Sequence, residues 1–250
     1  MILNDSELVF GERRYERRSV SFFDILGWRN HIKVAGNNPR HIARLASLPL
    51  LFCRAVTSFS ERIEGAQITS FSDNVIVSVP YTTETVFSSL QGIAKVILGA
   101  AAMGFFIRGA FTIGDLVHDE HIVFGPALIR AYELESKRAI FPRTILDPEL
   151  SELMQLKADF IANDSEFSFI QPFNCEFIER AMLGNSVNIE MMEKFESIAS
   201  FRSVESFAGV TSQMLLDVIL ARVLAEQASA DSADIKDKYS WLLKQISDKL

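Results

Sequence analysis

The sequence has few of the residues that stabilise small metal-bound or disulfide-linked folds. Its 250 residues include only two cysteines, Cys53 and Cys175, which form no CxxC pair and have no histidine at ligand spacing. A structural zinc site and a disulfide framework are therefore not expected. No apolar segment follows Met1, so no signal peptide is predicted. The longest apolar stretch, residues 93–107, contains Lys95 and two glycines and is too short to span a bilayer. We expect a cytoplasmic protein without stable membrane association.

The chain also lacks an excess of positive charge. Its formal net charge is −7, and its one basic run, residues 13–18, is short and interrupted. Nucleic-acid-binding proteins usually carry a basic patch or stripe, so no nucleic-acid partner is predicted. There is no internal repeat and no glycine- or proline-rich linker. Because 48% of the residues are apolar, the chain can bury a substantial core.

The spacing of apolar residues predicts an α+β fold. Strands are expected at 18–25, at 67–79 as two strands around a turn, and at 105–117, 122–124 and 143–146. Helices are expected at 41–63, 82–103 and 127–138, with a kink or break at Pro49 in the first. The order matches the ferredoxin-like split βαβ pattern, an antiparallel sheet with helices on one face.

Past residue 150 the apolar spacing that indicates helices and strands becomes less regular. A strand is predicted within 167–173, and helices at 188–195, 211–226 and 235–250. We therefore divide the chain into a catalytic core, residues 1–150, and a mostly helical C-terminal extension, residues 151–250. The extension is expected to pack on the core or on a dimer partner.

Two aspartates occupy unusual places in this pattern. Asp24 interrupts an apolar strand, and Asp73 lies at the tip of the predicted hairpin. A carboxylate on a buried strand is costly unless it is paired or bound to a metal. In a split βαβ fold the two residues can meet at one end of the sheet, where paired carboxylates can hold two divalent cations. The alternative is that both aspartates only serve local turns.

Four short motifs resemble those of class III nucleotidyl cyclases, in the same order and over roughly residues 18–147. The family pattern F-x-D-[IV]-x-G-[FW] is matched by residues 22–28, FFDILGW. The family's hairpin aspartate corresponds to Asp73, although Ser72 replaces the usual preceding glycine. The strand motif R-x-G-[IVA]-x-x-G corresponds to residues 108–114, RGAFTIG, and the following helix to residues 125–135, GPALIRAYELE.

This resemblance implies a reaction and a set of ligands. Asp24 and Asp73 would hold two Mg²⁺ or Mn²⁺ ions, assisted by the Ile25 carbonyl. The nucleotide would lie against the FFDILGW motif, at Phe23, Leu26, Gly27 and Trp28, with the backbone of the last three around the triphosphate. Active sites of the family form between two catalytic domains, so a homodimer is implied.

The base-reading positions depart from the family. The lysine that selects adenine corresponds to Thr69, and the second base-reading residue corresponds to Ile122. Both changes remove side chains that read a purine edge.

The catalytic helix departs as well. The ribose-positioning asparagine corresponds to Ile129, and the transition-state arginine to Glu133. Arg130, one residue beyond Ile129, is a candidate replacement or else a surface arginine. Arg143 is a second candidate for contact with phosphate.

The altered pattern is similar to the pyrimidine cyclases of bacterial Pycsar anti-phage systems. That similarity implies synthesis of cyclic UMP or cyclic CMP as a messenger read by a separate effector, and we place UTP before CTP. The alternatives are a purine cyclase with a rearranged base pocket and a catalytically silent nucleotide-binding module. A third alternative, polymerase-palm chemistry such as cyclic dinucleotide synthesis, lacks its hairpin signature here.

Overall fold

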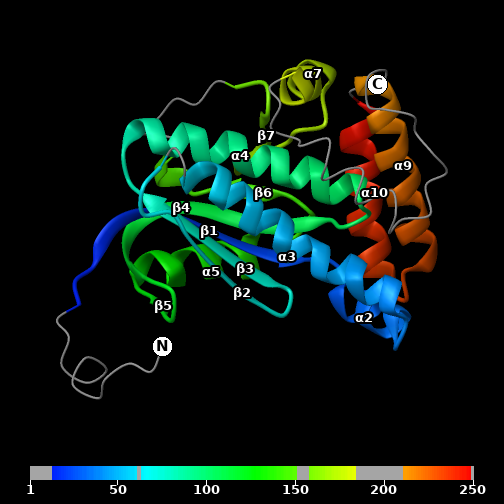
Figure 1. Cartoon of the computed structure of the whole chain (residues 1–250). Helices are drawn as coiled ribbons and strands as arrows, with labels where there is room; N and C mark the ends of the chain where they lie inside the picture. Colours follow the sequence, from blue (N-terminus) through cyan, green and yellow to red (C-terminus); the bar gives the residue numbers. More distant parts are fainter. Residues whose placement is uncertain (1–12, 61–62, 151–157, 184–210, 249–250) are drawn as a thin grey trace.

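The computed structural model describes residues 13–60, 63–150, 158–183 and 211–248. Its centre is an eight-stranded sheet with the order β2-β3-β1-β4-β6-β8-β7, and β5 pairs with β4 outside this path (Figure 1). All pairs are antiparallel except β4 with β6. The strands are β1 (Glu16–Ile25), β2 (Gln67–Phe71), β3 (Asn74–Pro80), β4 (Ile107–His118), β5 (Val123–Phe124), β6 (Thr144–Leu146), β7 (Ile161–Asn163) and β8 (Ser168–Ile170). The predicted α+β class and its split βαβ core are confirmed.

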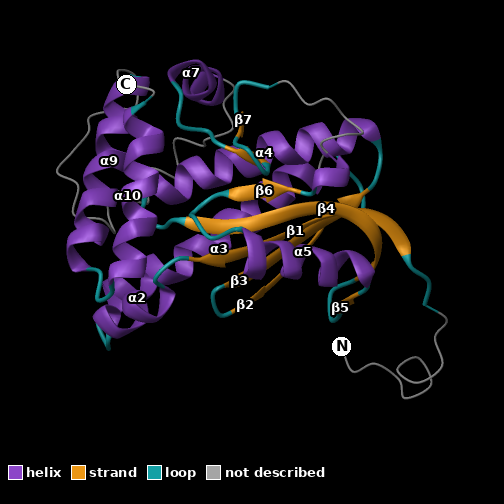
Figure 2. Ribbon diagram, turned by 180° about the vertical axis from the view of Figure 1, so that it is seen from behind, coloured by secondary structure: helices purple, strands orange, loops and turns teal. Residues whose placement is uncertain are grey.

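Helices lie on both faces of the sheet, which corrects the expectation of one covered face. The described helices are α2 (Trp28–Ala35), α3 (Pro39–Ser60), α4 (Thr83–Ala102), α5 (Pro126–Arg138), α7 (Cys175–Leu183), α9 (Ser212–Ser229) and α10 (Ala233–Ser247). Figure 2 shows α5 lying across β1 and β4, on the side of the sheet away from α3 and α4. A second helix layer forms because β1 is apolar on both faces.

The two faces of β1 fill two separate clusters. Side chains alternate along a strand, so Phe23 and Ile25 enter the large cluster with α4. Val20 and Phe22 point the other way, onto Ala127 and other residues of α5. Asp24 is an even number of residues from Val20 and Phe22, so its side chain points to the same side of the sheet, toward α5, near the end of β1.

Two helices differ from the prediction. The α3 helix continues through Pro49 as one helix, so of the expected kink or break the break does not occur. The α2 helix was not predicted, because it has only eight residues and half of them are polar. It begins after Gly27, whose φ is 74°. By contrast α4 begins and ends where the sequence indicates, at a Thr82 capping box and just before Gly104.

The C-terminal extension adds both strands and helices to the core. Strand β8 pairs with β6, and β7 pairs with β8, so the sheet continues across residue 150. Helices α9 and α10 pack beside the end of α4, and their buried residues join the main cluster. The helix expected at 188–195 lies outside the described residues.

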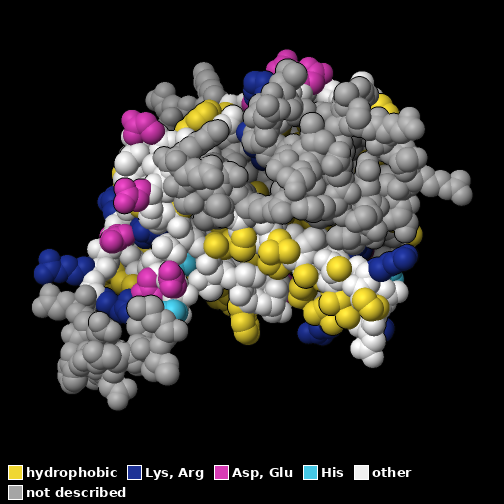
Figure 3. Space-filling model, in the orientation of Figure 1, with side chains coloured by type: hydrophobic (Ala, Val, Ile, Leu, Met, Phe, Trp, Pro, Cys, Tyr) yellow, Lys and Arg dark blue, Asp and Glu magenta, His cyan; other side chains and the backbone are white. Residues whose placement is uncertain are grey.

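One described helix, α4, is long and apolar enough to cross a membrane by length and composition. Its apolar window is 61% buried inside the protein, which is the environment of a core helix. Exposed apolar side chains gather instead over α2 and α3, where Figure 3 shows them; they include Ile32, Val34, Ile42 and Leu50.

Candidate active site

The structure brings Asp24 and Asp73 together. Asp24 is paired in register with Asn74 on β3, and the backbone N–H of Ile25 donates to the Asp73 carbonyl at 3.2 Å. The tight turn that places Asp73 there puts Ser72 at φ 56°, a conformation that favours the glycine usual at this position in the cyclase motif. A local turn therefore sets the distance between the two carboxylates.

The pKa of Asp24 is raised by this arrangement. Burial is the largest cause, and Arg108 opposes it; the charge of Asp73 and a side-chain hydrogen bond with it raise the pKa further. The neighbouring carboxylate therefore opposes ionisation of Asp24, and a nearby cation would favour it.

Arg108 supplies a positive charge to this group. On β4 it lies directly across from Asp24, and its Nη2 is 2.9 Å from Asp24 Oδ2. Its Nε is 2.6 Å from Oε1 of Glu135 on α5, an ion pair without hydrogen-bond geometry. Only 4% of the Glu135 side chain is exposed, and burial raises the pKa of Glu135 to about 7 against the lowering effect of Arg108.

The roles of Arg108 and Glu135 are not evident from the sequence motifs alone. The cross-strand register of β1 and β4 was the missing signal, since it places the motif arginine opposite the motif aspartate. The position of Glu135 beside Arg108 depends on the length of α5, because this helix packs along β4 and Glu135 lies in its last turns.

The turn after β1 combines a left-handed glycine with the start of a helix. Gly27 has a left-handed φ of 74° and is the N-cap of α2, so the N–H groups of the first helical turn lie beside Asp24 in the chain. Helix N-termini favour anions. Tyr239 of α10 lies behind this turn, 3.6 Å from where a Gly27 Cβ would be. Trp28 is half-buried against the main cluster.

Phe23 has a different position from the other residues of this motif. Its side chain is fully buried and packs on Phe52, with ring centroids 5.2 Å apart. Its side chain therefore belongs to the core, and only its backbone lies near the site.

The two candidate arginines have partners elsewhere. Arg130 donates to both carboxylate oxygens of the buried Asp147, each at 2.9 Å. The charges that affect it are Asp147, Glu149 and Glu133, and neither Asp24 nor Asp73 is among them. Arg143 is buried, pairs with Asp164 and lies over the Phe169 ring at 4.9 Å. Within one chain, neither arginine joins the aspartate pair.

The candidate base-reading residues lie away from the aspartates. Thr69 is half-buried on β2, and its hydroxyl is 3.0 Å from Nε2 of His118 at the end of β4. Ile122, in the turn after β4, is 36% exposed, and its backbone bonds to Asp119 on both sides. His118 itself is buried.

The residues present fit hard divalent cations. Carboxylate and carbonyl oxygens are the ligands that Mg²⁺ and Mn²⁺ prefer, and Mg²⁺ usually takes one or two carboxylates plus water and substrate phosphate. Asp24 and Asp73 supply such a pair, and Ile25 adds a backbone carbonyl. Within the described residues no third His, Cys, Asp or Glu completes a ligand group, so other coordination positions fall to phosphate and water.

No protein-family model and no curated protein matches this chain. Among solved structures, a bacterial light-regulated adenylyl cyclase is similar, with 12% identity over 68% of this chain and all of that chain, at a TM-score of 0.46. The guanylyl cyclase domain of the RhoGC fusion protein from the aquatic fungus Blastocladiella emersonii has 13% identity, 63% and 95% coverage and a TM-score of 0.46.

A class III adenylyl cyclase-like ATP-binding protein from Pseudomonas aeruginosa has 11% identity to this chain. The match covers 85% of this chain and 44% of that one, at a TM-score of 0.38. Because identities and TM-scores are this low, the function of the chain is inferred from its own residues.

Proposed function

We propose that the chain is a nucleotidyl cyclase that converts a pyrimidine nucleoside triphosphate, UTP before CTP, to its 3′,5′-cyclic monophosphate and pyrophosphate. The observation that carries the proposal is the meeting of Asp24 and Asp73 beside the Gly27 turn. Paired carboxylates next to a helix N-terminus suit a ligand that combines divalent cations with a polyphosphate.

Each residue has a distinct part in this proposal. Asp24, Asp73 and the Ile25 carbonyl would hold two Mg²⁺ or Mn²⁺ ions. When bound, such ions lower the pKa of an attacking hydroxyl and neutralise charge on the leaving pyrophosphate. The backbone of Leu26, Gly27 and Trp28 would orient the triphosphate. Arg108, already within reach of Asp24, keeps the aspartate pair compensated before the cations arrive.

The pyrimidine part of the proposal rests on the base-reading positions. Thr69 and Ile122 provide no long polar side chain for a purine edge, and Thr69 provides a hydroxyl instead. By the same resemblance the product would serve anti-phage defence in the cytoplasm, through a separate effector.

A homodimer is part of the proposal. The hairpin and the outer side of α5 expose apolar side chains, with Phe71 at 78%, Ile129 at 63% and Tyr132 at 54%. A second copy seated on this surface would cover them and bring its own α5 toward the aspartates. Such an arrangement would also place the partner's copies of the α5 side chains near the substrate.

The test is incubation with ATP, GTP, CTP and UTP separately, with Mn²⁺, followed by mass spectrometry of the products. Cyclic UMP or cyclic CMP is expected, and D24N and D73N should each reduce turnover at least about 100-fold. D115N changes an exposed aspartate on β4 and should have no effect. Exclusive cyclisation of ATP or GTP would refute the pyrimidine assignment.

A second candidate function is a catalytically silent nucleotide-binding module. It is favoured by one observation: Arg130, the replacement candidate for the transition-state arginine, is held by both oxygens of Asp147. Nucleotide binding without turnover of any of the four triphosphates would establish it.

A further inference from the structure

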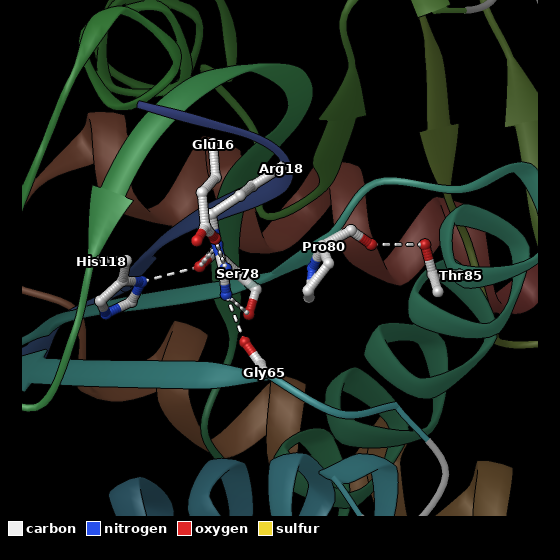
Figure 4. A network of polar contacts seen from close by, with 7 residues as sticks. All are labelled: Glu16, Arg18, Gly65, Ser78, Pro80, Thr85 and His118. Carbon is white, nitrogen blue, oxygen red and sulfur yellow. Dashed lines mark hydrogen bonds and ion pairs between the residues drawn. The ribbon is translucent and has the colours of Figure 1, made fainter. Parts of the chain in front are cut away.

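A chain of buried and half-buried hydrogen bonds runs from Arg18 on β1 through Ser78 on β3 and His118 at the end of β4 to Thr69 on β2. Arg18 Nε is 2.9 Å from Ser78 Oγ, and Ser78 Oγ is 2.8 Å from His118 Nδ1. His118 Nε2 is in turn 3.0 Å from Thr69 Oγ1. Figure 4 shows Ser78 between the Arg18 guanidinium and the His118 ring. We call these four residues the Thr69 hydrogen-bond chain.

The direction of this chain is set at its buried end. A guanidinium can only donate, so Ser78 Oγ accepts from Arg18. Ser78 is 1% exposed, so its one hydroxyl proton needs an acceptor inside the protein. The His118 Nδ1 atom is the acceptor in reach, and Ser78 therefore donates to it.

The protonation state of His118 determines the direction of the next hydrogen bond. Burial and the nearby charge of Arg18 lower the pKa of His118 to about 4, so the ring is neutral at physiological pH. A neutral imidazole whose Nδ1 accepts carries its proton on Nε2. His118 consequently donates to the Thr69 hydroxyl oxygen.

Thr69 is left with a proton to give. Its hydroxyl accepts from His118 and has no other hydrogen-bond partner among the residues that the structure describes. The side chain is half-buried on the sheet face that carries α5, and α5 lies mainly over β1 and β4. Phe71, two residues along the same strand, is 78% exposed on that face. A ligand there would meet a hydroxyl that donates, beside an aromatic ring.

We propose that the Thr69 hydrogen-bond chain fixes Thr69 as a donor and so selects a nucleotide base with a carbonyl, not an amino group, at the edge facing it. The inference rests on the proposed function for the identity of the ligand. Among pyrimidines it selects uracil, whose O4 accepts, over cytosine, whose N4 amino group donates. The same rule applied to purines would favour guanine over adenine.

Calorimetric titration with 3′-deoxyuridine triphosphate and 3′-deoxycytidine triphosphate in Mn²⁺ tests this without turnover, because neither has the attacking hydroxyl. The wild-type protein should bind the uridine analogue at least about 10-fold more tightly, since O4 of uracil accepts the Thr69 proton and the amino group of cytosine would leave that proton without an acceptor. T69V, which keeps the shape and loses the hydroxyl, should abolish the preference. T69S should retain it, and S70A is the control at an exposed neighbouring position.

S78A tests the chain itself, because Ser78 lies behind His118 and not at the surface. In S78A the hydroxyl that donates to His118 Nδ1 is absent, so His118 can carry its proton on Nδ1 and accept at Nε2 from Thr69. The Thr69 proton would then be used within the protein, and Thr69 could accept from the amino group of cytosine. S78A should therefore reduce the preference for the uridine analogue. If S78A does not fold, the ¹⁵N chemical shifts of His118 in the wild-type protein provide the second measurement. They should show a proton on Nε2 from pH 6 to 8.

Each outcome is decisive. Equal or tighter binding of the cytidine analogue, or a proton on His118 Nδ1, would overturn the inference. A preference for the uridine analogue without turnover of any triphosphate would sustain it and refute the cyclase proposal. Binding of neither analogue would refute both.

Discussion

The Nη2 atom of Arg108 lies 2.9 Å from Oδ2 of Asp24, across the pair formed by β1 and β4. A carboxylate expected to hold a cation therefore has a guanidinium as its neighbour. The side chains are 23% and 20% exposed, so water screens the pair only partly. Arg108 keeps the acidic end of the sheet stable until other cations compensate it.

Substitution of Arg108 by glutamine should destabilise the protein strongly. Removing one partner of a buried ion pair leaves uncompensated charge and costs about 3 kcal/mol. The loss should be larger at pH 8 than at pH 5, because Glu135, whose pKa is about 7, is protonated at the lower pH. Urea unfolding at both pH values measures it.

The control for this variant is R138Q, which breaks the exposed pair with Glu166 at 3.7 Å. Exposed pairs contribute about 0–1 kcal/mol, so its effect should be small at both pH values. An R108Q effect as small as that of R138Q would mean that Arg108 does not compensate the aspartates.

Glu135 gives a pH dependence with a defined sign. Its pKa is about 7 in the folded protein against a reference of 4.5, so between these values the folded state binds more protons than the unfolded state. This stabilisation is complete below about pH 4.5 and is lost as pH rises through 7. The free energy of unfolding of the wild type minus that of E135Q should therefore fall over this range.

Chemical unfolding at pH 5, 6, 7 and 8 measures this difference. His31 and His118 have pKa values lowered to about 4 and act in the opposite direction, but they are present in both proteins and cancel. A difference that stays constant or grows with pH would contradict the account.

Much of this site could be anticipated from local sequence. Asp24 stands out as a charge in an apolar strand, and the Ser72–Asp73 turn is indicated by its residue types. Arg108 and Glu135 could not be found in this way, because their roles depend on strand register and helix length. The hydrogen bonds of His118 could not be found for a related reason, since its partners Thr69 and Ser78 come from two other strands, β2 and β3.

Gly109 is required by the close approach of β4 to β1. A Cβ at this position would lie 2.6 Å from the Phe22 carbonyl oxygen and 2.7 Å from Phe23 Cδ1. G109A should therefore destabilise the protein by about 2 kcal/mol or more. G99A is the matched control in α4, where the Cβ meets Leu51 at an ordinary 3.5 Å; it should be neutral or stabilising by about 0.5–1 kcal/mol. Thermal unfolding that shows no difference between the two variants would contradict this prediction.

The proposed dimer surface can be tested by charge. I129E and F71D place carboxylates on exposed apolar positions of α5 and β2, and each should shift the protein from dimer to monomer in analytical ultracentrifugation. V34D changes a side chain that is 66% exposed on α2 and should leave the dimer intact. Dissociation by V34D alone would place the interface on the α2 and α3 side.

The fold was less fully predictable than the aspartate pair. Helices α4, α9 and α10 follow from apolar spacing and clear N-caps at Thr82, Thr211 and Ser232. The short strand β7 and the helix α2 have too few residues for a periodic signal. The position of α5 opposite α3 and α4 depends on tertiary packing, which the spacing within one segment does not specify.

The sites of bound Mn²⁺ test the central claim most directly. Crystals grown with Mn²⁺ and 3′-deoxyuridine triphosphate, measured at the manganese absorption edge, would locate the ions by anomalous scattering. We expect two peaks about 4 Å apart, coordinated by the carboxylates of Asp24 and Asp73. Electron density with no manganese at these carboxylates, and Arg108 still paired with Asp24, would contradict the account.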